Sequence, residues 1–339
     1  MELSPPSPKS GTRRSRSAIT LLADQPTRAI LLTLGDAAGV PGGGFAITEH
    51  PFAGVTPRLV RDRLRGLERL GLAVAVERAA GHGDGPTLWA LTAAGRALFN
   101  LYALLERIAG HAAELPANAS PAERAAALDL ALTTLADPAA TRLLETLALS
   151  ATALDPPTLE ASVAPVPRRT LYRRLTPLVE AKVVHRIVGR TVPRSTTYLL
   201  HDRWRPVAAI AVLSLWWESR HWPEVQIGDA NAIYAVLYAL APLVHLPAAS
   251  HGQVVQWTVQ QPSGALTGTV ACTDGRLTVA RSGATPSGAA VAASAAGSPA
   301  VWADALVTGR VAELELGGNT ELTRRILAAL RAALLTYVR

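Results

Sequence analysis

The length, composition and charge of the chain limit its class: 339 residues can hold two or three domains, and 49% apolar residues exclude a disordered protein. The formal net charge of +7 lies entirely in residues 1–222, and all but two of the 33 basic residues are arginines, which predicts a polyanionic partner for this part. The single cysteine, Cys272, excludes an internal disulfide framework and a cysteine metal cluster.

Two segments bear on localisation. Residues 1–17 are polar, rich in proline and serine, and lack an apolar core, which predicts a disordered basic tail and not a signal peptide. The uncharged run Ala230–Ala249 is long enough to cross a bilayer, but Pro242, His245 and Pro247 interrupt it, which favours a buried helix ending near Pro242. We therefore expect a cytoplasmic protein with no membrane partner.

Parts of the first two-thirds of the chain repeat each other. The repeated pairs are LADQPTRAILLTL (Leu22–Leu34) with LADPAATRLLETL (Leu135–Leu147), offset by 113 residues, and Val55–Val74 with Val166–His185, offset by 111 residues. This indicates two copies of one unit, over 18–112 and 122–222, joined by a short polar linker, 113–121.

Each copy has the same predicted order of elements. In the first copy, apolar residues at helical spacing over 18–34, with Asp24 placed to cap a helix from Pro26, precede a helix that starts at Thr56-Pro57 and ends at Gly71, a hairpin over 72–91 and a helix over 92–110. In the second copy, helices at 124–136 and 138–149 precede a proline-punctuated stretch at 155–165, a helix at 167–181, a hairpin at 183–200 and a helix at 204–221.

The last segment, 226–339, is not a third copy. It comprises a predicted helix at 229–241, strands at 252–260, 265–273 and 276–281, a small-residue loop, the segment 298–310, a strand-like run at 311–316 and a closing helix at 319–338. The pattern is α+β with a small, mostly antiparallel sheet. The expected fold class of the whole chain is thus mainly α with α+β.

In each copy the helix that precedes the hairpin, from Thr56-Pro57 in the first copy and at 167–181 in the second, carries arginines on one face. If Val60 and Leu64 face the core, arginines three and four residues apart line the opposite face, where phosphate and base-edge contacts need them. The predicted DNA-contacting residues are Thr56, Arg58, Arg61, Arg65 and the hairpin residue Arg78 in the first copy, and Arg168, Arg169, Tyr172, Arg173 and the hairpin residues Arg190 and Arg194 in the second. The alternative is that these arginines only form the solvent-exposed face of an amphipathic helix and contact no ligand.

Three stretches resemble a known family. They are GVTPRLVRDRLRGLERLGL (Gly54–Leu72), LWALTAAGRALFNLYALL (Leu88–Leu105) and VPRSTTYLLHDRWRP (Val192–Pro206), and through them both copies resemble the HxlR-type branch of MarR-like winged helices. The resemblance implies two winged helix-turn-helix domains, double-stranded DNA as the partner, and a transcriptional regulator, with repression the family-level expectation.

The chain also departs from that family. Members usually carry one such domain and dimerise, whereas this chain has two, so we expect a pseudo-dimer within one chain, with helices 94–109 and 204–221 packed together, or a homodimer. Pro51 interrupts the first helix of the motif in copy one, and Val166-Pro167 replaces the usual cap in copy two. The two copies are therefore not expected to be equally strong.

The last third resembles the sterol-carrier-protein-like fold. The similar blocks are VVQWTVQ (Val254–Gln260), ACTDGRLTVARSG (Ala271–Gly283) and Ser298–Leu330. The resemblance implies an apolar tunnel for a hydrophobic small-molecule effector, with Trp257, Trp302, Leu306, Leu316, Ile326 and Leu330 as its lining. The same residue types also build an ordinary core, so that alternative stays open.

Signatures of enzymes are missing from the sequence. There is no G-x-S-x-G, no P-loop and no HExxH or HxxxH spacing, so we expect no catalytic residue, no metal site, no cofactor and no enzymatic activity. The alternative function is a small-molecule binding or sequestering protein whose winged helices serve protein–protein contacts.

Overall fold

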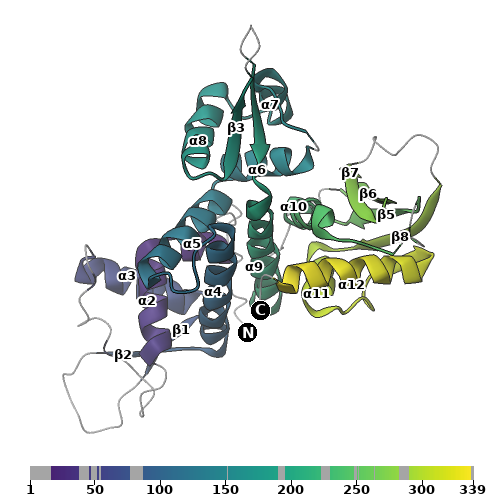
Figure 1. The fold of residues 1–339 in the computed structure, drawn as a ribbon. Coiled ribbons are helices and arrows are strands. Elements are labelled where there is room, and N and C mark those ends of the chain that lie inside the picture. Colours follow the sequence, from purple (N-terminus) through teal and green to yellow (C-terminus); the bar gives the residue numbers. More distant parts are fainter. Residues whose placement is uncertain are drawn as a thin grey trace. The chain divides into compact units, whose positions relative to one another are not determined.

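Figure 1 draws the helices and strands of the computed structural model. The chain divides into two compact units. The structure describes residues 17–37, 46, 52, 55–76, 87–150, 152–189, 195–222, 230–247, 250, 252–262, 264–281 and 290–336. The first unit takes in residues 1–100 and 220–226, and the second takes in 101–219 and 227–339. The architecture is mainly helical, with two small antiparallel hairpins and one larger mixed sheet.

The first unit contains the first sequence copy as far as residue 100. Its elements are α1 (Ala18–Ala23), α2 (Gln25–Asp36), α3 (Pro57–Arg69), β1 (Ala73–Val76), β2 (Leu88–Leu91) and the start of α4 (Ala93–Ala112). Asp24 caps α2 as predicted, because its carboxylate accepts a hydrogen bond from the Thr27 backbone N–H at 3.1 Å. Leu64 and Leu67 of α3 are buried with Leu31 of α2, so the predicted inner face of α3 is confirmed.

A tight turn joins α3 to the hairpin. Gly71 takes a left-handed conformation with φ of 70°, and the Leu72 backbone N–H donates to the Leu67 carbonyl at 2.9 Å, which ends the helix. Gly95 at the start of α4 lies so close to this turn that a Cβ there would stand 2.0 Å from the Leu72 carbonyl oxygen. Only glycine permits this packing of α4 on the turn.

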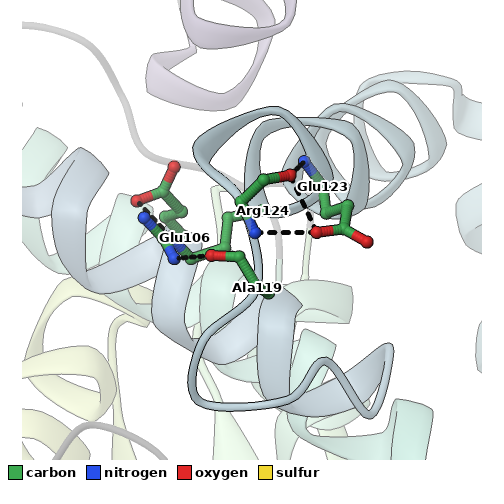
Figure 2. A network of polar contacts seen from close by, with 5 residues as sticks. Glu106, Ala119, Glu123 and Arg124 are labelled. Carbon is green, nitrogen blue, oxygen red and sulfur yellow. Dashed lines mark hydrogen bonds and ion pairs between the residues drawn. The ribbon is translucent and has the colours of Figure 1, made fainter.

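The segment predicted as a linker is an ordered corner of the second unit (Figure 2). Ser120 and Glu123 form a reciprocal capping box at the start of α5 (Pro121–Ala136). Arg124 donates from Nη1 to the Ala119 carbonyl and lies 4.0 Å, Nε to Oε2, from Glu106 of α4. The end of α4 and the start of α5 are thus held together by charge-assisted contacts.

The second copy follows with one helix more than predicted. Its elements after α5 are α6 (Pro138–Leu149), α7 (Pro156–Ser162), α8 (Arg168–Glu180), β3 (Val184–Val188), β4 (Thr196–Leu200), a 3-10 helix (Asp202–Val207) and α9 (Ala208–His221). The stretch 155–165 contains α7 because Pro156 and Pro157 occupy its first turn, where the missing N–H costs nothing, and Asp155 caps it. Leu154 forms an antiparallel bridge with Tyr198, which adds a third short chain segment to the hairpin.

The C-terminal part is an α+β domain within the second unit. α10 (Ala230–Leu240) and a 3-10 turn (Ala241–Leu243) precede a sheet of β5 (Val254–Val259), β6 (Leu266–Thr273), β7 (Arg276–Arg281), β8 (Val291–Gly297) and β9 (Glu315–Gly318), in the order β7-β6-β5-β8-β9. β5 and β8 pair in parallel, and the other three pairings are antiparallel. The helices α11 (Pro299–Thr308) and α12 (Thr320–Thr336) pack on β8.

Two sequence predictions for this domain were wrong. The small-residue loop predicted after residue 281 contains β8, which after Val291 consists of alanine, serine and glycine and lacks the branched residues typical of strands. Its small side chains leave room for α11 and α12, which explains why a strand with this composition packs there. The strand expected at 311–316 begins only at Glu315, after a turn at 312–313.

Helix α10 connects the second copy with the C-terminal domain. It packs on α6 and the 3-10 helix of the second copy as well as on α11 and α12. The Tyr234 hydroxyl lies 2.9 Å from the Trp257 carbonyl oxygen and 3.0 Å from that of Leu266, so α10 is also anchored to the sheet. Among the described helices, none is both long and apolar enough to cross a bilayer.

Candidate nucleic-acid interface

An aspartate–arginine pair holds the arginine helix of each copy. In the first copy Asp24, the cap of α2, accepts from Arg63 Nη2 of α3 at 3.0 Å. In the second copy Asp137, the cap of α6, forms the equivalent ion pair with Arg174 of α8. Arg63 and Arg174 were not singled out from the sequence. The repeat contains the signal, because within each copy both the capping aspartate and the arginine lie in segments that recur in the other copy.

The outer face of α3 is a stripe of exposed arginines. Arg58, Arg61 and Arg65 are all exposed, and none of them forms an ion pair with another described residue. Arg61 Nε donates to the Pro57 carbonyl at 3.4 Å, which leaves its terminal nitrogens to solvent. Thr56 caps the start of the helix through Oγ1, which accepts a hydrogen bond from the Leu59 N–H at 3.3 Å, and the residue is exposed.

The charge along α3 is uneven. An open hollow of about 590 Å³ near its C-terminal end is lined by Asp62, Arg65, Glu68 and Arg69, two carboxylates among two guanidiniums. Asp62, which is also exposed, lies one turn after Arg58 on the same outer face, so a carboxylate stands among the three arginines there. At the C-terminus of α3, the Trp222 indole N–H donates a hydrogen bond to the Leu70 carbonyl at 3.1 Å and fixes this end of the helix. This contact was not predicted from the sequence.

The outer face of α8 is different. Arg169 and Arg173 are exposed and have no ion-pair partner among the described residues. Arg168, however, places Nε 3.1 Å from Oε1 of Glu160 on α7, and the Tyr172 hydroxyl donates to the same oxygen at 2.9 Å. Burial and then this hydrogen bond raise the pKa of Tyr172. Two of the four predicted α8 residues are therefore tied to a carboxylate.

The structure describes the strands of both hairpins but none of the three hairpin arginines predicted to contact DNA. Arg78, Arg190 and Arg194 lie outside the described residues. On β3, Ile187 and Val188 are 47% and 51% exposed. At the base of the same hairpin His185 and His201 stack with ring centroids 4.2 Å apart.

The residues predicted to line a ligand tunnel are mostly core. Trp257, Trp302, Leu306, Ile326 and Leu330 are buried, and Leu316 on β9 is half-buried. The rings of Trp257 and Trp302 lie 5.1 Å apart, and Trp302 Nε1 donates to the Thr258 carbonyl at 3.0 Å. The Trp257 indole N–H is buried and has no hydrogen-bond partner among the described residues.

Metal and thiol chemistry find little support in the described part of the chain. It contains no group of three or more histidine, cysteine or carboxylate side chains that could hold a metal ion. Cys272 is buried, and burial raises the pKa of its thiol, which disfavours the reactive thiolate.

Comparisons with known proteins do not add a family. No family model matches the chain, and searches of curated proteins and of solved structures found no significant match.

Proposed function

We propose that the protein is a DNA-binding transcriptional regulator whose two copies are winged helix-turn-helix domains that bind double-stranded DNA. The order of helices and hairpin in each copy supports this, as does the Leu154 bridge to Tyr198, which stands where a winged helix has its first short strand. The observation that carries the proposal is the stripe formed by Arg58, Arg61 and Arg65.

The stripe has the properties that a groove-binding helix needs. Its inner edge is fixed to α2 by the pair of Arg63 with Asp24, and its C-terminus is fixed by Trp222. A rigid helix that presents several unpaired guanidiniums can contact phosphates and base edges together.

A binding assay over a range of salt concentrations tests the proposal. Fluorescence anisotropy with a labelled duplex from the DNA upstream of the gene should show affinity that falls steeply with salt, with a slope of about −0.9 per neutralised phosphate. Replacing Arg58, Arg61 and Arg65 together with alanine should lower that slope by about three if all three contact phosphates. Arg96→Ala, an exposed arginine of α4, is the matched control. Binding that the triple variant leaves unchanged would refute the role of α3.

The C-terminal domain is proposed to bind a hydrophobic small molecule that controls DNA binding. The unpartnered Trp257 indole N–H offers a polar group for such a ligand, and α10 connects the domain to the second copy. A ligand that favours one arrangement changes DNA affinity by its differential binding energy. Titration with a long-chain fatty acid, followed by tryptophan fluorescence and DNA anisotropy, should change both signals; no response in either would remove this effector class.

The alternative is a ligand-binding protein whose helical copies make protein contacts. The exposed Ile187 and Val188 on β3 favour it, since a large apolar side chain is exposed on each face of this hairpin. Under this reading, replacing both with serine weakens self-association measured by light scattering, and no salt-dependent DNA binding is found.

A further inference from the structure

Three side chains from two helices form a closed cluster at the start of α8. Glu160 Oε1 receives the Tyr172 hydroxyl at 2.9 Å and Arg168 Nε at 3.1 Å. The Arg168 guanidinium carbon also stands 5.8 Å from the centre of the Tyr172 ring, within cation–π range. Each member therefore contacts the other two, and α7 supplies the carboxylate that joins them.

The cluster leaves one edge of Arg168 available. Its Nε is engaged by Glu160, whereas its two terminal nitrogens have no partner among the described residues, and 76% of the side chain is exposed. A guanidinium offers pairs of N–H groups, and guanine presents two acceptors, O6 and N7, that match such a pair in the major groove. An arginine held at Nε has fewer orientations to lose when it makes this contact.

The first copy keeps the glutamate of the cluster but not its two partners: Glu160 corresponds to Glu49, which lies outside the described residues. At the 111-residue offset, Pro57 corresponds to Arg168 and Arg61 corresponds to Tyr172. Arg61 contacts only the Pro57 carbonyl among described residues. The cluster is thus specific to the second copy and is not a requirement of the shared fold.

We propose that Glu160 is a positioning residue that makes Arg168 selective for the guanine of a G·C base pair. The inference rests on the proposed function. A carboxylate beside the helix also repels the phosphate backbone, so Glu160 lowers affinity for DNA in general while it raises discrimination between bases. Arg168 would be the residue that touches the base, and Glu160 would act through it.

The test selects preferred sites from a randomised duplex library with the full-length protein. In the wild type one G·C position should be preferred by about tenfold over other pairs. Glu160→Ala and Arg168→Ala should both reduce that preference to near one. Their effects on random-sequence DNA should be opposite, with tighter binding for Glu160→Ala and weaker binding for Arg168→Ala.

Two further variants separate positioning from charge and from damage to the fold. Glu180→Ala removes an exposed carboxylate at the other end of α8 and should keep the base preference. Glu160→Gln retains an acceptor for Tyr172 without the charge and should give an intermediate preference. Circular dichroism checks that each variant is folded.

The outcomes distinguish this inference from the proposed function. If the wild type binds no duplex in a salt-dependent manner, both are overturned. If it selects a motif that Arg168→Ala or Glu160→Ala leaves intact, only the role of the cluster is overturned.

Discussion

Helices α3 and α8 carry similar residues on their buried faces and different residues on their exposed faces. At the 111-residue offset Leu64 matches Leu175, and Arg63 matches Arg174 in its ion pair with the capping aspartate. On the outer face, Arg61 of α3 corresponds to Tyr172 of α8. The two copies therefore agree at the positions that hold the helix in place and differ at positions on its exposed face.

The surroundings of the two helices differ as well. Helix α3 belongs to a unit made of residues 1–100 and 220–226, whereas α8 belongs to a unit that also holds the C-terminal domain, which α10 connects to the second copy. We infer that α3 supplies most of the electrostatic attraction to DNA and that α8 supplies selectivity and the link to the C-terminal domain.

The largest expected effect comes from the core of the second unit. Trp302→Ala removes a fully buried ring and its hydrogen bond to Thr258, which should destabilise this unit by about 3–5 kcal/mol. Hydrogen exchange measured by mass spectrometry should show faster exchange in α12 and β5 and unchanged exchange in α2 and α3. Equal acceleration in α3 would show that the two units unfold as one.

The capping aspartates test whether the copies share a scaffold. Asp24→Ala and Asp137→Ala should each cost about 1–2 kcal/mol, chiefly from the lost cap, because the ion pairs are partly exposed. Denaturant unfolding measures the loss. Asp24→Asn and Asp137→Asn, which keep a capping oxygen, should lose less than the alanine variants. A large effect in one copy and none in the other would contradict the equivalence.

The turns after the two helices offer a smaller, matched comparison. Lys182 adopts φ of 57° where the first copy has Gly71 at 70°. A side chain is strained in this region, so Lys182→Gly should stabilise by about 0.5–1 kcal/mol and Gly71→Ala should destabilise by about 1 kcal/mol. Thermal unfolding checks both signs. Stabilisation by Gly71→Ala would mean that the left-handed turn is not needed.

The smallest expected effect is the contribution of His201 to the pH dependence of stability. His201 stacks on His185 in the second copy. Burial, then Arg203 and His185, lower its pKa, whereas Glu114 and Asp202 oppose the shift. The folded state thus favours neutral His201, so its contribution is intact above the ordinary pKa of about 6.5 and is lost as the pH falls below that value. The melting temperature of His201→Gln should fall less than that of the wild type between pH 7.5 and 5.5. An equal fall in the melting temperatures of the variant and the wild type would show that His201 does not contribute to the pH dependence of stability.

Sequence patterns predicted the elements whose signals are local. Apolar spacing and caps gave α6 and β7 with their observed bounds and α3 within a residue or two. They failed where the signal is weak or points the wrong way: β8 has no branched residues in its centre, and the prolines of α7 suggest a break although they open a helix.

The candidate site divides in the same way. The exposed face of α3 follows from helical periodicity alone, so Arg58 and Arg61 were found. The Glu160 cluster depends on how α7 packs against α8, which no local pattern reports. Likewise, only packing distinguishes a buried Trp257 in a core from one beside a ligand.

The most direct test of the account compares the two helices in one salt titration. The wild type, the α3 variant with Arg58, Arg61 and Arg65 replaced by alanine, and an α8 variant with Arg169 and Arg173 replaced by alanine are bound to the same duplex over a range of salt concentrations. We predict a slope lower by about three for the α3 variant and by about two or less for the α8 variant. Slopes that neither set of substitutions changes would contradict DNA binding through these helices.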